Sequence, residues 1–183
     1  MTRARFIAAA LVGLVAGLTA CADVRVDRRV VDEQLLAALG LAQSYQHEAD
    51  ELEAAGDRAQ ALARVRQVLE IPFPEGAPES EDVRLDAWGR AAELQLADGD
   101  HDGAEETVRR GLAEATRTSY FKARLHAVRG RILRARAELL RAAGRDEEGR
   151  QVGREAIEAF EQSIAINREV LGMDPGRDAG RGD

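Results

Sequence analysis

The chain has little of the material from which catalytic and metal sites are built. Its only cysteine is Cys21, so no disulfide can form within one chain. The three histidines, at positions 47, 101 and 126, have no metal-ligand spacing to one another. No serine lies in a Gly-x-Ser-x-Gly elbow, and no Gly-x-x-x-x-Gly-Lys phosphate loop occurs. These absences predict a protein that is not an enzyme and that holds no metal and no cofactor.

Aromatic side chains and positive charge are also scarce. Aromatic residues make up 4% of the chain, and its only lysine is Lys122. The 33 acidic residues outnumber the 26 basic ones, which gives a formal net charge of −7. Because nonspecific nucleic-acid binding relies on basic residues that neutralise phosphates, this acidic chain is not expected to bind nucleic acid.

One apolar run, near the amino terminus, stands out. Arg3 and Arg5 precede an apolar stretch at residues 6–17, which is too short to span a bilayer comfortably. The stretch is followed by Leu18-Thr19-Ala20-Cys21, which resembles the lipobox of bacterial lipoproteins. An uncleaved anchor and an ordinary secretory signal are the alternatives.

The lipobox resemblance implies both a modification and a location. It implies that residues 1–20 are a signal peptide, cleaved between Ala20 and Cys21, and that Cys21 then carries acyl chains such as palmitate. Ala22 is not the aspartate that resembles a retention signal in bacteria with two membranes. We therefore expect a lipid-anchored protein of the cell envelope, held by a short tether at residues 21–26. It would lie in the outer membrane facing the periplasm, or on the outer face of the plasma membrane where there is only one.

Beyond residue 26 the sequence has the composition of helices, interrupted at regular intervals by glycine turns. The glycines of three such turns, Gly56, Gly99 and Gly144, are 43 and 45 residues apart. A near-constant period of this size indicates a helical repeat in which each unit packs against the next. We expect a helical domain at residues 27–172 and a disordered tail at residues 173–183.

Local signals predict three pairs of helices and a linker. Three prolines interrupt the chain at residues 71–80, and Ser80 is expected to cap the helix that follows. Thr118 or Ser119 is expected to cap the fifth helix. The six helices are predicted at about 27–55, 58–70, 81–97, 102–116, 119–143 and 146–171.

Apolar side chains form a stripe on each of the last two predicted helices. In the fifth helix the stripe runs from Phe121 to Leu139 with spacings of three and four residues. In the sixth, Phe160, Ile164 and Leu171 fall on one side, and Ile157 lies close beside them. Both stripes are predicted to be buried in the core.

Residues 27–171 resemble the tetratricopeptide repeat family, whose unit is two antiparallel helices with small residues where they cross. The motif positions hold Tyr45, Ala49, Gly56 and Ala61 in the first unit, Trp88, Ala92, Gly99, Ala104 and Gly111 in the second, and Leu133, Ala137, Leu140 and Gly144 in the third. The third unit departs from the motif, because Gly149 replaces its second small crossing residue. The resemblance implies an all-α, right-handed solenoid of about three antiparallel helix pairs, and a compact helical bundle is the alternative.

The turn at Asp98-Gly-Asp100-His-Asp102-Gly103 copies the opening of a calcium-binding loop. The twelfth position of that loop, however, is Arg109, a positive charge where the ion needs a bidentate carboxylate. We interpret the segment as an acidic turn between helices, and weak calcium binding remains an alternative.

Charged residues fall at the positions that line the concave groove in tetratricopeptide arrays. The candidate groove residues are Arg131, Arg134, Glu138 and Arg141 in the third unit, Asp86 and Glu93 in the second, and Gln43, Gln46, Asp50 and Glu53 in the first. Such a polarised groove could orient a partner peptide. The alternative is that the arginines pair with acids on neighbouring helices or face solvent.

Together these features predict a membrane-anchored lipoprotein that acts as a noncatalytic protein-interaction adaptor in the cell envelope. Its partner would be an envelope protein or peptide. The alternative is a structural lipoprotein that self-associates into a homo-oligomer and has no dedicated peptide groove.

Overall fold

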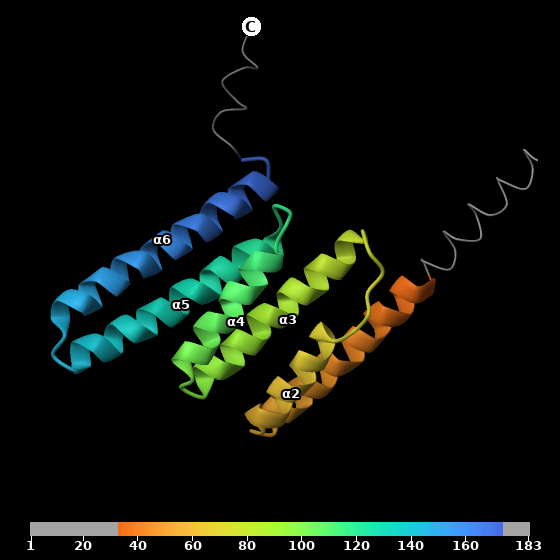
Figure 1. The fold of residues 1–183 in the computed structure, drawn as a ribbon, viewed down its shortest axis with the longest axis horizontal. Helices are drawn as coiled ribbons and strands as arrows, with labels where there is room; N and C mark the ends of the chain where they lie inside the picture. Colours follow the sequence, from red (N-terminus) through yellow and green to blue (C-terminus); the bar gives the residue numbers. More distant parts are fainter. Residues whose placement is uncertain (1–32, 174–183) are drawn as a thin grey trace, which may run out of the picture.

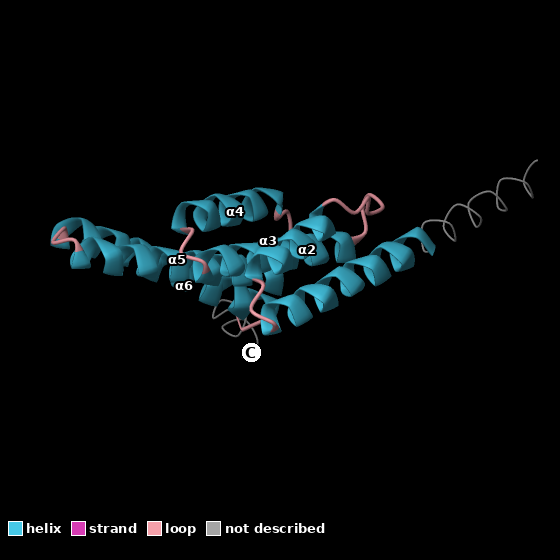
Figure 2. Ribbon diagram, turned by 90° about the horizontal axis from the view of Figure 1, so that it is seen from below, coloured by secondary structure: helices cyan, strands magenta, loops and turns pink. Residues whose placement is uncertain are grey.

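The computed structural model describes residues 33–173, and all of the regular secondary structure in this part is helical (Figures 1 and 2). The predicted signal peptide, the Cys21 tether, the start of the first helix and the tail beyond Met173 lie outside the described residues. The helices are a first helix, which occupies residues 33–54 of the described part, α2 (Arg58–Leu69), α3 (Pro78–Ala97), α4 (His101–Glu114), α5 (Tyr120–Ala142) and α6 (Asp146–Val170). Among the described residues, no helix is long and apolar enough to span a membrane.

The three predicted glycine turns connect the helices into pairs. Gly56, Gly99 and Gly144 have φ values of 85°, 80° and 75°, in the left-handed region that favours glycine. In the second turn, the Gly99 N–H donates to the Leu96 carbonyl at 3.0 Å and the Asp100 N–H donates to the Gln95 carbonyl at 2.9 Å. These two bonds form a Schellman motif, and the other two turns have the same pattern.

In the first two turns, the residue after the glycine also begins the returning helix. The Asp57 carboxylate accepts from the Gln60 N–H, and the Asp100 carboxylate accepts from the Gly103 N–H, both at 3.0 Å. Each aspartate therefore satisfies a free N–H at the amino end of α2 or α4. This double use of one residue keeps the turns short and the paired helices antiparallel.

The structure confirms one predicted helix cap and corrects another. The Ser119 hydroxyl accepts from the Lys122 N–H at the start of α5, as predicted. Ser80, in contrast, is buried within α3, which begins two residues earlier at Pro78. Proline is favoured in the first helical turn, where its missing N–H needs no partner, so Pro78 starts the helix before Ser80 can cap it.

Small residues allow the two helices of each pair to cross closely. Ala49 and Ala61 are fully buried in the first pair, as are Ala92 and Ala104 in the second. In the third pair, a Cβ added to Gly149 would lie 3.0 Å from the Ala137 carbonyl oxygen. Gly149 therefore allows a closer crossing than alanine would, which explains the departure from the repeat pattern at this position.

The pairs stack side by side in chain order, as Figure 1 shows. One apolar cluster joins Val65 and Val68 of α2 to Ala91 and Leu94 of α3. A second cluster joins Val108 of α4 to residues of α3 and α5, and a third joins α5 to α6. Because each cluster links neighbouring elements, the architecture is a helical-repeat solenoid and not a closed bundle around one core.

The predicted core stripes are confirmed only in part. Leu125, Val128 and Ile132 of α5 are fully buried, whereas Leu139, in the last turn of α5, is exposed. In α6, Phe160 is half-buried and its ring packs against Gly130 of α5, but the prediction was wrong for Ile157, Ile164 and Leu171, which are exposed. Beside Phe160, the face of α6 that packs on α5 is formed by small residues, namely Gly149, Ala156, Ala159 and Ser163.

Candidate protein-interaction surface

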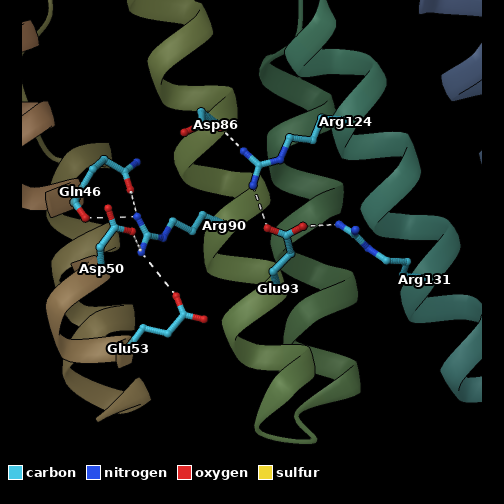
Figure 3. Close-up of polar contacts among 8 residues, drawn as sticks. All are labelled: Gln46, Asp50, Glu53, Asp86, Arg90, Glu93, Arg124 and Arg131. Atoms are coloured by element: carbon cyan, nitrogen blue, oxygen red, sulfur yellow. Dashed lines mark hydrogen bonds and ion pairs between the residues drawn. The ribbon is translucent and has the colours of Figure 1, made fainter. Parts of the chain in front are cut away.

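A network of charged and polar side chains connects the first helix of each pair (Figure 3). We call it the charge ladder. Its eight members are Gln46, Asp50 and Glu53 of the first helix, Asp86, Arg90 and Glu93 of α3, and Arg124 and Arg131 of α5.

Arg90 forms the part of the ladder between the first two repeats. Its guanidinium lies 2.5 Å from an Asp50 carboxylate oxygen and 3.4 Å from one of Glu53. It also donates to the side-chain oxygen of Gln46 at 2.8 Å and to the Gln46 backbone carbonyl at 3.2 Å. The Arg90 side chain is only 15% exposed, so its stem also contributes to the packing between the first helix and α3.

The part between the second and third repeats is centred on Glu93. One Glu93 oxygen accepts from Arg124 at 2.7 Å, and the other accepts from Arg131. Arg124 also pairs with Asp86, two helical turns before Glu93 on α3. The arginines therefore hold α5 against α3 with three charge-assisted hydrogen bonds.

The ladder is partly shielded from solvent, and its electrostatics show this. Burial raises the pKa of Asp86, and the positive charges of Arg124 and Arg90 offset this only in part. Asp86 is therefore an inner member of the ladder. Asp50 and Glu53 are exposed at the end formed by the first helix.

The structure brings some of the candidate groove residues together and leaves others apart. Asp86, Glu93 and Arg131 belong to the ladder. Arg134 and Glu138 lie further along α5, are 65% and 66% exposed, and approach each other to 3.9 Å. Arg141 contacts α6, where it donates to the Gly149 carbonyl at 3.3 Å.

The ladder is therefore polarised along the solenoid. Exposed carboxylates lie at the first-helix end, and exposed or half-buried arginines lie at the α5 end. Acids and arginines alternate and pair between these ends. Such a surface can orient a bound segment by charge.

Arg90 was not predicted as a site residue, although the sequence contains a signal for it. Asp86, Arg90 and Glu93 are spaced four and three residues apart, which places them on one face of a helix. Gln46, Asp50 and Glu53 have the same spacing on the first helix. Two matching polar faces of this kind, one with two carboxylates and an amide oxygen and one with a central arginine, indicate pairing between the helices.

The acidic segment at Asp98–Asp102 forms the turn between α3 and α4. The Asp100 carboxylate is used as a helix cap, and Asp98 lies 3.6 Å from Arg58. Within residues 33–173, no group of three or more His, Cys, Asp or Glu side chains is arranged to hold a metal ion.

A separate cleft lies beside the proline-rich linker, at residues 71–78, and has a volume of about 760 Å³. Four of the charged side chains that line it, Glu81, Arg84, Glu114 and Arg117, form polar contacts across it. Arg84 pairs with Glu114 at 2.9 Å, and Glu81 accepts from the Thr116 and Arg117 N–H groups at 3.0 and 3.1 Å. These contacts fix the loop between α4 and α5 against α3.

The stacked helix pairs and the polar face that crosses them define a helical-repeat protein. The model of the tetratricopeptide repeat family matches residues 52–127, from the last turn of the first helix into α5. Neither the curated proteins nor the solved structures gave a match to the chain. The family match and the three helix pairs support tetratricopeptide-like repeats, which commonly mediate protein-protein interaction.

Proposed function

We propose that this protein is a lipid-anchored, noncatalytic adaptor that binds an envelope protein through the surface around the charge ladder. The observation that carries the proposal is the polarised polar face on a tetratricopeptide-like solenoid. A repeat array presents an extended surface that suits a peptide or a protein segment.

The charge distribution indicates how a partner would lie. A partner segment with an acidic residue at one end would place that residue near Arg131, Arg134 and Arg141 of α5. Basic residues at its other end would lie near Asp50 and Glu53 of the first helix. The exposed pair of Arg134 and Glu138 can separate at little cost, since exposed ion pairs contribute about 0–1 kcal/mol.

Membrane attachment through Cys21 is the second part of the proposal. It is supported by the lipobox resemblance at Leu18-Thr19-Ala20-Cys21. Acyl chains contribute ~0.8 kcal/mol per buried methylene, so two or three chains hold a protein firmly on a membrane. We expect Cys21→Ser to abolish labelling by radioactive palmitate and to release the protein from the membrane fraction. Unchanged labelling and fractionation would contradict the anchor and leave the adaptor surface untested.

Site-specific photocrosslinking in intact cells tests the partner surface. A photoreactive residue at position 134 should crosslink one defined partner, identified by mass spectrometry. The matched control is position 109 on α4, where the Arg109 side chain is 68% exposed but pairs only within its own helix. The double variant Arg131→Glu and Arg134→Glu, crosslinked from position 138, should lose the partner. Equal crosslinking from positions 134 and 109 would refute the ladder as the binding surface.

A further inference from the structure

Three large apolar residues are exposed along one side of α6 and its C-cap. Ile157 and Ile164 of α6 and Leu171 at the C-cap are 58%, 57% and 70% exposed. They are spaced by seven residues, which aligns them along the helix axis. We call this surface the α6 stripe. Three exposed aliphatic residues aligned on one side of a helix indicate an interaction surface, unlike single exposed residues.

The repeats show what this surface does elsewhere in the molecule. Ile157 lies thirteen residues after the turn glycine of its pair, and Leu69 and Leu112 hold the same position in the first two pairs. Leu69 packs against the cluster that contains residues of α3, and Leu112 packs against the cluster that contains residues of α5. In each case the cluster that the leucine packs against includes residues of the next helix pair. Ile157 belongs to the surface that would contact a further pair.

Within residues 33–173 no helix follows α6 to cover the stripe. Any occupant of the stripe needs an apolar face of its own to cover it.

We infer that the occupant is a second copy of this chain, docked antiparallel so that the two α6 stripes pack on each other about a two-fold axis at Ile164. The stripe is symmetric about Ile164, with Ile157 and Leu171 each seven residues away. An antiparallel pair places Ile157 of each subunit against Leu171 of the partner subunit. A C2 interface requires this self-complementarity, and a single row of three apolar residues provides it.

The charges beside the stripe favour the same arrangement. Arg154, Glu161 and Arg168 flank it at seven-residue intervals with alternating sign. Glu161 and Arg168 form no ion pair within the described part of the chain. Antiparallel packing brings Glu161 close to Arg168 of the partner subunit, and the pair occurs twice. Parallel packing would instead place identical residues of the two copies at the same level.

This dimer is expected to be reversible and to leave the charge ladder free. A contact built on one helix per subunit is smaller than the interfaces of permanent dimers, so association should depend on concentration. No member of the ladder belongs to the stripe or its charged flank. The inference therefore does not depend on the proposed partner surface.

Disulfide crosslinking of the full chain in detergent tests the axis directly. We expect Ile164→Cys to form a disulfide-linked dimer on mild oxidation, because the two Cα atoms must approach within about 7 Å. The control is Ala165→Cys, which is also exposed but lies on a different side of α6. Both variants retain Cys21, so the wild-type chain gives the common background. No dimer at position 164, or an equal yield at position 165, would overturn the inference.

Two further variants separate this interface from other modes of association. Ile164→Arg should raise the dissociation constant measured by sedimentation at least about tenfold while the circular dichroism spectrum is unchanged. Glu161→Arg and Arg168→Glu should each weaken the dimer, and the double variant should restore it. A dimer that survives Ile164→Arg, or a double variant as weak as the single ones, would contradict the antiparallel α6 interface.

Discussion

Replacing Arg90 tests whether the charge ladder holds the first two repeats together. Arg90→Met keeps most of the stem and removes the guanidinium with its contacts to Asp50, Glu53 and Gln46. The two carboxylates are exposed, so each ion pair contributes about 0.2–1 kcal/mol, and the hydrogen bond to Gln46 contributes about 1 kcal/mol. The carboxylates regain water after the substitution, and no buried charge is left unpaired. We expect a loss of about 1.5–3 kcal/mol in the free energy of unfolding.

Urea unfolding followed by circular dichroism measures this loss, and Arg109→Met is the matched control. Arg109 pairs with Glu106 on the same exposed helix face, so its removal should cost less than about 0.5 kcal/mol. At 1 M salt the Debye length is about 3 Å, and the difference between Arg90→Met and the wild type should shrink. An effect of Arg90→Met no larger than that of Arg109→Met would refute the ladder as a structural link between repeats.

Two other features give measurable predictions. A Cβ on Gly111 would lie 2.7 Å from the Trp88 Cβ, so Gly111→Ala should destabilise the protein by about 1–3 kcal/mol relative to Gly40→Ala, whose Cβ meets no atom within 4 Å. Equal melting temperatures for the two variants would show that α3 and α4 are not closely packed there. Burial raises the pKa of Glu81, but hydrogen bonds from Thr116 and Arg117 outweigh it and lower the pKa overall, so stability should fall as pH decreases below about 4.5. Glu81→Gln should reduce the fall in the free energy of unfolding below about pH 4.5. An unchanged pH dependence would show that Glu81 is not the group responsible.

The helix pairs could be predicted from the sequence because their turns are local structures. A glycine such as Gly99 ends one helix in the left-handed conformation, and the aspartate that follows it caps the next. Both requirements fall on adjacent residues, and the same pattern recurs 43 and 45 residues apart. The Ser80 cap failed for a related reason, since Pro78 and Ser80 both signal a helix start and the sequence does not rank them.

The charge ladder and the exposed stripe depend on packing between helices, which spacing along one helix does not determine. The helical spacing of Asp86, Arg90 and Glu93 identifies a polar face, but the partners of Arg90 are 37–44 residues away in sequence. In α6 the spacing of Ile157, Ile164 and Leu171 identifies an apolar face of the helix, but it does not identify which element packs on that face. The helix packs on α5 through small residues instead, because Gly149, Ala156 and Ala159 allow close approach.

The unusual length of the third helix pair connects the two proposed interactions. The first helices of tetratricopeptide-like pairs contact the preceding repeat. In the third pair α5 has 23 residues and α6 has 25, whereas α4 of the second pair has 14. The end of α5 extends past α3 and α4 (Figure 1), and it carries Arg134 and Glu138 in exposed positions. Within residues 33–173 no helix pair follows α6, whose apolar stripe is exposed. The end of α5 would thus provide a charged surface for a partner and α6 an apolar surface for a second copy, so adaptor function and self-association are compatible in one molecule.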